Sequence, residues 1–271
     1  MSEVPGTSVP SSRNAWYWVA LVGTGIIGGL LSGMFGIGGG IVMVPLLISI
    51  ARMDQRRAAA TSLVAIVPTS VAGSLTYLAN GEIDLVAGAI VAVGAIVGAI
   101  IGSLLLRRIP LVWLRWMFIA LVIAVAVRMV FVIPVRGEQL ELTGLLGLGY
   151  LALGLIMGIC SGLFGIGGGV IAVPSFIALF GMSDLIAKGT SLLVMIPTGI
   201  TGTITNVRGK LVDVSAGLVV GLAATLAAVP GVAIALLLSP RVSSLLFAAL
   251  LVAAAIQLSV RAVRAQRPPA V

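Results

Sequence analysis

Two glycine-rich runs set in apolar sequence are the parts of this chain best suited to bind an ion. GMFGIGGGIVMVP covers positions 33 to 45, and GLFGIGGGVIAVP follows 129 positions later, at 162 to 174. Glycine lets the backbone turn sharply and approach another group closely. A helix that begins after such a break presents free N–H groups and the positive end of its dipole, and both favour an anion. We therefore expect two backbone anion sites, formed by Gly36, Gly38, Gly39 and Gly40 and by Gly165, Gly167, Gly168 and Gly169.

The same glycines have a simpler interpretation, in which they only allow membrane helices to cross closely. Packing of that kind requires small residues at helical spacing, whereas each run contains three consecutive glycines. The spacing favours a site over packing, and the packing alternative stays open.

Hydroxyl side chains and prolines follow each glycine run at equivalent positions. A Ser or Thr hydroxyl can cap a helix or donate to a substrate oxygen, although in membrane helices it often bonds its own backbone. A proline inside a helix removes a hydrogen bond, so a kink is expected there. The candidate substrate-binding hydroxyls are Thr61, Ser62, Thr69, Thr190, Ser191 and Thr198. The expected kinks are at Pro45, Pro68, Pro174 and Pro197.

Composition places the chain in a membrane. It has 271 residues, of which 60% are hydrophobic and 9% charged, and its mean hydropathy is +1.24. A transmembrane helix needs about 20 apolar residues, and runs of that length begin at Trp16 and continue almost to the end. The chain has no histidine and one cysteine, so neither a metal site nor a cofactor is expected. The sequence predicts an all-α, polytopic transmembrane bundle.

The chain is built from two copies of one unit. Positions 33 to 88 share 22 identities with positions 162 to 217 when the halves are aligned without gaps. Each copy is predicted to contain a long helix, a glycine break, a short segment and three further helices. The expected segments are 16 to 36, 41 to 51, 58 to 79, 84 to 106 and 112 to 133 in the first copy. In the second copy they are 143 to 164, 170 to 181, 187 to 207, 213 to 238 and 242 to 262.

Positive charge selects the topology. If the chain turns back at each glycine break, twelve of its sixteen Lys and Arg residues fall on the side of the amino terminus, which the positive-inside rule makes cytoplasmic. If it runs straight through, the charges divide equally. Arg128, Arg136, Lys188 and Arg241 remain outside in the first case. Two copies of five segments then enter the membrane in opposite directions, the inverted-repeat plan of secondary transporters. The predicted units are a cytoplasmic tail at 1–15, repeats at 16–133 and 143–262 joined by an external linker at 134–142, and a cytoplasmic tail at 263–271.

Other classes of protein fit poorly. All eight acidic residues are expected in tails, loops or helix ends, so no carboxylate proton relay is visible, and Asp84 and Asp213 are interpreted as helix caps. GIGGG is not followed by the GK[ST] of a phosphate-binding loop. No catalytic constellation is present, so the chain is not predicted to be an enzyme. The basic tail suits anionic lipid rather than nucleic acid.

The doubled GxFGIGGGxxxVP motif, followed by TS and PT in each half, resembles the sulfite exporter TauE/SafE family of membrane transporters. The resemblance covers about positions 28 to 263, and both copies of the motif are intact. It implies export of sulfite, organosulfonates or related small sulfur-containing anions across the cytoplasmic membrane.

Residues and resemblance together predict a secondary transporter of small anions that works by alternating access in the cell membrane, with both termini cytoplasmic. A passive anion channel on the same scaffold is the first alternative, and a membrane scaffold that transports nothing is the second. The expected partners are a small anionic substrate and the lipid bilayer. A coupling ion, proton or sodium, and the oligomeric state stay open at this stage.

Overall fold

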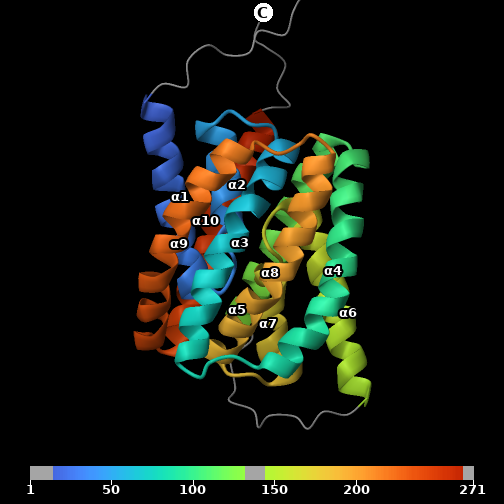
Figure 1. The fold of residues 1–271 in the computed structure, drawn as a ribbon, viewed down its shortest axis with the longest axis vertical. Helices are drawn as coiled ribbons and strands as arrows, with labels where there is room; N and C mark the ends of the chain where they lie inside the picture. Colours follow the sequence, from blue (N-terminus) through green and yellow to red (C-terminus); the bar gives the residue numbers. More distant parts are fainter. Residues whose placement is uncertain (1–14, 132–143, 265–271) are drawn as a thin grey trace, which may run out of the picture.

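A computed structural model describes residues 15–131 and 144–264, and within these ranges the chain forms ten α-helices and no strand (Figure 1). The first half contains α1 (Ala15–Phe35), α2 (Gly40–Ile50), α3 (Gln55–Ala79), α4 (Leu85–Arg108) and α5 (Leu111–Phe131). The second contains α6 (Gly144–Phe164), α7 (Gly169–Phe180), α8 (Asp184–Arg208), α9 (Val214–Leu237) and α10 (Pro240–Arg264). The linker expected at 134–142 lies outside the described residues, as do nearly all of the two expected tails.

Each expected segment is a helix whose ends lie within three residues of the predicted ones. In the described part of the chain, seven helices are long and apolar enough to cross a membrane. Three shorter apolar stretches accompany them: α2, α7 and the portion Leu111–Val125 of α5. The prediction of an all-helical, polytopic membrane protein is therefore confirmed.

The chain reverses direction at both glycine runs. In Figure 1, α1 begins at the upper end of the molecule and α2 returns toward that end, whereas α6 begins at the lower end and α7 returns there. The described chain starts and finishes at the same upper end, with α1 and α10. The turn-back course that the charges favoured is the one the chain takes.

The first helix of each half packs along the fourth helix of the other half. The two pairs are α1 with α9 and α4 with α6, and small residues at four-residue spacing line both interfaces. Gly94, Gly98 and Gly102 of α4 lie against backbone carbonyls of α6, at Leu151, Leu155 and Ile159. Because a Cβ atom would fall on those carbonyls, glycine at these positions allows the two helices to cross closely.

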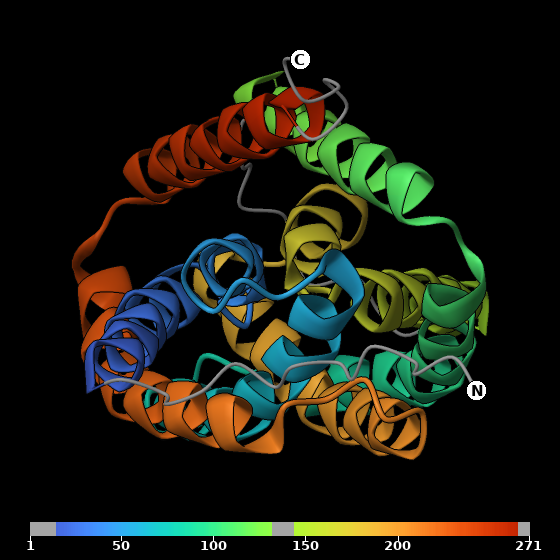
Figure 2. The same cartoon turned by 90° about the horizontal axis from the view of Figure 1, so that it is seen from above.

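Helices α3 and α8 cross in the middle of the molecule, and α5 and α10 pack together along one side (Figure 2). Two aromatic contacts join this outer pair to the ends of α1 and α6: Phe247 stacks on Phe35 with ring centroids 5.2 Å apart, and Phe118 stacks on Phe164 at 5.3 Å. The two contacts are equivalent under the 129-residue repeat, so the α5–α10 pair touches both halves in the same way.

Candidate functional site

The glycine breaks are sharp turns between a long helix and a short one. Phe35 ends α1 and Gly40 begins α2, while Phe164 ends α6 and Gly169 begins α7. The backbone is left-handed, with φ between 69° and 86°, at Gly36, Gly38, Gly39, Gly165, Gly167 and Gly168. Only glycine adopts this conformation at little cost, which explains why the runs contain glycine and not alanine.

The two breaks touch each other across the two halves. A Cβ atom on Gly40 would fall on the carbonyl oxygen of Gly165, and one on Gly169 would fall against the carbonyl oxygen of Gly36. The fold thus brings the two glycine runs, which the sequence showed to be equivalent, into backbone contact.

One residue from each central helix lies against both breaks. A Cβ atom on Gly38 or Gly167 would lie 2.6 or 2.9 Å from the sulfur of Met195. It would also lie 3.3 Å from a methyl group of Ile66 at either position. Ile66 and Met195 are themselves equivalent residues of α3 and α8, so they mark the centre of the arrangement.

Each break leaves backbone amides free. Gly39 and Gly168 occupy the N-cap positions of α2 and α7 and supply no side-chain cap. Their carbonyls accept the first hydrogen bonds of the two helices, from Val42 and Met43 and from Ile171 and Ala172. Among the described residues, no partner is found for the amides at 38–41 and 167–170. Free amides at the start of a helix are donors suited to an anion.

Ser62 and Ser191 bind the break of the opposite half. Ser62 Oγ lies 2.6 Å from the carbonyl oxygen of Gly165 and donates to it, and also lies 2.9 Å from the carbonyl oxygen of Ala59 in its own helix. Ser191 Oγ donates to the carbonyl oxygen of Gly36 at 2.9 Å. All four of these side chains or glycines are buried. The serines therefore hold the two halves together at the breaks, and their protons are already committed to carbonyl groups.

Thr61 and Thr190 position the fourth helices. Thr61 Oγ1 accepts from the amide of Asp213 at 3.0 Å, and Thr190 Oγ1 accepts from the amide of Asp84 at 2.9 Å. Asp84 and Asp213 in turn cap α4 and α9 through their carboxylates, which confirms their expected role as caps. Both threonines are fully buried, so these bonds link the central helices of one half to a helix start in the other.

The third helix of each half begins three residues before the predicted starts at 58 and 187. Helix α3 begins at Gln55 and α8 at Asp184, a turn or more before the Thr-Ser pairs. Asp54 caps α3 by accepting from the amides of Arg56 and Arg57, and Ser183 caps α8 by accepting from the amide of Ile186. The helices extend past the apolar stretch because a polar first turn with a good cap is as helical as an apolar one.

Thr69 and Thr198 bond locally. Each hydroxyl donates to a carbonyl one turn earlier in its own helix, at Ala65 and Val194, over 2.7 Å in both cases. The two threonine hydroxyls therefore bond their own helices in this conformation, which is the alternative that the sequence left open.

The prolines expected to kink their segments lie inside α2, α3, α7 and α8: they are Pro45, Pro68, Pro174 and Pro197.

Two serines that the sequence analysis missed are the unexplained polar groups near the breaks. Ser32 and Ser161 are fully buried, and neither Oγ atom has a hydrogen-bond partner among the described residues. They occupy equivalent positions in the last turns of α1 and α6, and their carbonyls accept from the amides of Gly36 and Gly165. The shared Ser directly before Gly33 and Gly162 was the available signal, since it extends the repeated motif by one residue.

Ser32 and Ser161 lie on the faces of their helices that meet the breaks. One turn earlier, Gly28 and Met157 contact the positions where Cβ atoms of Gly39 and Gly168 would lie. Residues four apart share one face of a helix. A buried polar group without a partner is rare and requires an explanation, and a bound solute is one such explanation.

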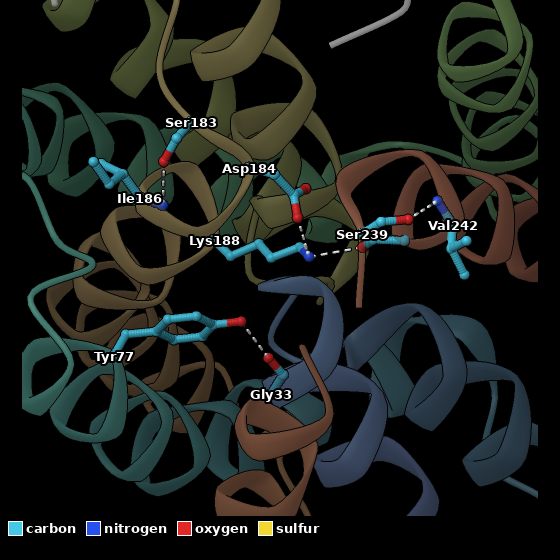
Figure 3. A network of polar contacts seen from close by, with 9 residues as sticks. Gly33, Tyr77, Ser183, Asp184, Ile186, Lys188, Ser239 and Val242 are labelled. Atoms are coloured by element: carbon cyan, nitrogen blue, oxygen red, sulfur yellow. Dashed lines mark hydrogen bonds and ion pairs between the residues drawn. The ribbon is translucent and has the colours of Figure 1, made fainter. Parts of the chain in front are cut away.

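A buried charged pair lies beside the first break. Lys188 Nζ donates to Asp184 Oδ2 at 2.6 Å and to Ser243 Oγ at 2.7 Å, and the lysine and aspartate side chains are 2% and 6% exposed (Figure 3). Asp184 is at a helix start, as expected of the acidic residues, but it is buried and paired. Lys188 was expected on the outer side and was not identified from the sequence as a buried residue. The side chain of Arg128 lies outside the described residues.

Removal of the hydroxyl of Ser62 or Ser191 is predicted to destabilise the protein. Ser62→Ala leaves the buried carbonyl of Gly165 without its partner, and Ser191→Ala does the same to that of Gly36. We expect a loss of about 1–3 kcal/mol in the free energy of unfolding for each. Thermal unfolding of the purified protein in detergent measures this, with Ser49→Ala as control because Ser49 is exposed and bonds only to Pro45 in its own helix. Equal melting temperatures for Ser62→Ala and the control would contradict the assignment.

Comparisons with known proteins agree with this architecture. The family model described as "Sulfite exporter TauE/SafE" matches residues 4–129 and 150–271. The probable membrane transporter protein YunE of Bacillus subtilis is 26% identical over an alignment of 213 residues, which covers 70% of this chain and 78% of that protein. A probable membrane transporter protein of Haemophilus influenzae is 30% identical over an alignment of 185 residues, which covers 66% of this chain and 69% of that protein. No solved structure matches.

Proposed function

Because the chain belongs to the sulfite exporter TauE/SafE family, we propose that it is a secondary transporter that exports small anions, sulfite and organosulfonates foremost, by alternating access. The family match and the seven candidate spans identify the chain as a multi-pass membrane protein of a transporter family. The observation that carries the proposal is the pair of touching breaks with free amides and an unpartnered buried serine at each.

The chemistry of the breaks suits a sulfur oxyanion. Sulfite and sulfonate groups present oxygen atoms that accept hydrogen bonds, and an anion leaving water must regain donors for them. The amides at 38–41 and 167–170 supply donors only, and the hydroxyls of Ser32 and Ser161 can each donate one hydrogen bond as well. The break carbonyls of Gly36 and Gly165 would repel an anion, and Ser62 and Ser191 bind both of them. The hydrogen bonds from Ser62 and Ser191 therefore reduce the repulsion between these carbonyl oxygens and an anion bound at the breaks.

The two halves give a physical basis for alternating access. We take them as oppositely directed repeats, with both chain ends on the cytoplasmic side, and the breaks lie where the halves meet. Exchange between two arrangements of the halves would expose the breaks to one side and then the other. Non-helical backbone at this depth is tolerated only where protein or a water-filled cavity surrounds it, and the breaks satisfy that condition in the protein interior.

Transport from liposomes tests the function. Purified protein is reconstituted in liposomes loaded with radiolabelled sulfite, and release is followed with and without an imposed pH gradient, with taurine, thiosulfate and sulfate as competitors. We expect saturable release that competitors reduce and that responds to the gradient. Release that rises linearly with the sulfite gradient, without saturation or exchange, identifies a channel. No release above empty liposomes for any of these anions overturns the proposal.

A further inference from the structure

We propose that Lys188 and Asp184 form the charged part of the anion site: the transported anion replaces Asp184 as the partner of the Lys188 ammonium, and Asp184 takes up a proton. This rests on the proposed function and adds a charged residue and a coupling ion to it. The proton comes from the water on the side from which the anion enters and ends on a carboxylate oxygen of Asp184. One proton would therefore accompany each singly charged anion.

The position of Lys188 ties the pair to the first break. A Cβ atom on Gly36 would lie 2.6 Å from the Cα atom of Lys188, so the lysine backbone packs directly on the glycine that begins the break. Its side chain extends from α8 toward the start of α10, which Ser239 directly precedes (Figure 3). An ammonium group has three N–H donors, and within the described residues the contacts to Asp184 and Ser243 use two. A third donor is thus available to an incoming oxyanion before the ion pair separates.

The two halves differ at this cluster, since the equivalent break of the first half is built without charges. The equivalents of Lys188, Asp184 and Ser243 in the first half are Ala59, Gln55 and Leu114. Ala59 packs on Gly165 in the same way as Lys188 packs on Gly36, with no charge. A buried ion pair contributes little net stability compared with apolar residues, and charged groups inside membrane segments usually serve substrate or ion pathways. Charge at one break and not the other indicates a role beyond packing.

The surroundings of the pair keep the exchange electrically balanced. Ionised Asp184 neutralises Lys188 when the site is empty, and the anion neutralises it when Asp184 is protonated. The other titratable or charged groups near this part of α8 are Tyr77 of α3, Glu82 in the α3–α4 connection, Asp84 at the start of α4 and Arg241 at the exposed start of α10. The amide of Asp84 donates to Thr190 of α8. Tyr77 is buried and its hydroxyl donates to the carbonyl of Gly33 at 2.9 Å (Figure 3). Helices α6 and α7, which also pack on α8, carry no acidic or basic residue.

Ser243 and Ser244 extend the cluster onto α10. Both are buried, and Ser244 Oγ has no hydrogen-bond partner among the described residues. The same helix belongs to the α5–α10 pair on the side of the molecule, so the Lys188–Ser243 bond joins that pair to the central helices (Figure 2). Release of Lys188 to an anion would loosen this link, which would couple occupancy of the site to movement between the two layers.

Two variants separate the charge from the packing. The double variant Asp184→Gln/Lys188→Ala reproduces the residues of the first half and is expected to fold. Asp184→Asn keeps the ammonium but cannot exchange a proton. Glu82→Gln is the matched control, because it removes a nearby carboxylate that contacts neither Lys188 nor Ser243. All variants and the wild type are reconstituted and assayed for sulfite counterflow at equal pH, for uptake driven by a pH gradient, and for the shift in melting temperature that sulfite produces.

We expect the double variant to raise the KM for sulfite at least about tenfold and to lose most of the thermal shift, since a charge-assisted contact is gone. Asp184→Asn is expected to keep counterflow, to lose pH-driven accumulation, and to show a larger sulfite-induced shift than the wild type because the anion neutralises an otherwise unpaired charge. The inference is overturned if wild-type protein transports sulfite and both variants match it in KM and pH response. Should the double variant not fold, Asp184→Asn alone decides: pH-driven accumulation equal to wild type overturns the inference. A wild type that moves no anion would instead remove the proposed function.

Discussion

Replacement of Gly39 by valine is expected to abolish transport while the protein still inserts in the membrane. The backbone at Gly39 is left-handed, with φ of 72°, and a Cβ atom there would fall on the carbonyl oxygen of Gly28. A β-branched residue therefore forces the break out of position, and a shift of about 1 Å at a site can reduce a rate about a hundredfold. Gly168 is the equivalent residue of the second break: its φ is 86°, and a Cβ atom there would collide with Met157. Gly168→Val is therefore also expected to abolish transport. Initial sulfite release at equal protein content measures the effect.

Gly23→Val provides the control for these variants. Gly23 lies in α1, and a Cβ atom there would meet nothing within 4 Å. The same chemical change at this open position of α1 should therefore leave transport at the wild-type rate. Gel filtration of each variant in detergent distinguishes a folded, inactive protein from an aggregated one. Normal flux in both Gly39→Val and Gly168→Val would show that the breaks serve only packing.

Removal of the unpartnered hydroxyls is expected to weaken transport without weakening the fold. Ser32 and Ser161 donate no hydrogen bond within the described structure, so alanine at either position removes no contact and leaves the melting temperature unchanged or slightly raised. If each hydroxyl donates to a substrate oxygen, each single change should raise the KM for sulfite about tenfold, and the double change about a hundredfold. This is the opposite of Ser62→Ala, which is expected to reduce stability.

Ser74→Ala is the matched control for this experiment, because the Ser74 hydroxyl is already bonded to the carbonyl of Val71 in its own helix. We expect its KM to equal that of the wild type. A double Ser32→Ala/Ser161→Ala variant with an unchanged KM would remove the two serines from the binding site. A marked loss of melting temperature would show instead that they have structural partners in another conformation.

Local sequence determined most of the architecture. Apolar runs predicted all ten helices, and the 129-residue repeat predicted the equivalence of the two halves. Glycine runs predicted the two breaks, and the distribution of Lys and Arg predicted that the chain turns back there. These features depend on local composition, on repetition along the chain or on the order of charges, so they can be read without knowing what a segment will contact. The starts of α3 and α8 were placed too late for the same reason: hydropathy reports where apolar sequence begins, while Asp54 and Ser183 begin the helices in polar sequence.

Only the tertiary structure decided which polar groups are free. Ser62 and Ser191 were candidates to bind substrate, but each bonds the break of the other half, and Thr61 and Thr190 hold helix starts there. The hydroxyls of Ser32 and Ser161 have no hydrogen-bond partner within the part of the chain that the structure describes. Lys188 donates to Asp184 in its own helix and to Ser243 on α10. A hydroxyl or an ammonium has the same chemistry in every sequence context. Its role depends on partners brought from distant positions, and the crossing of the two halves determines those partners.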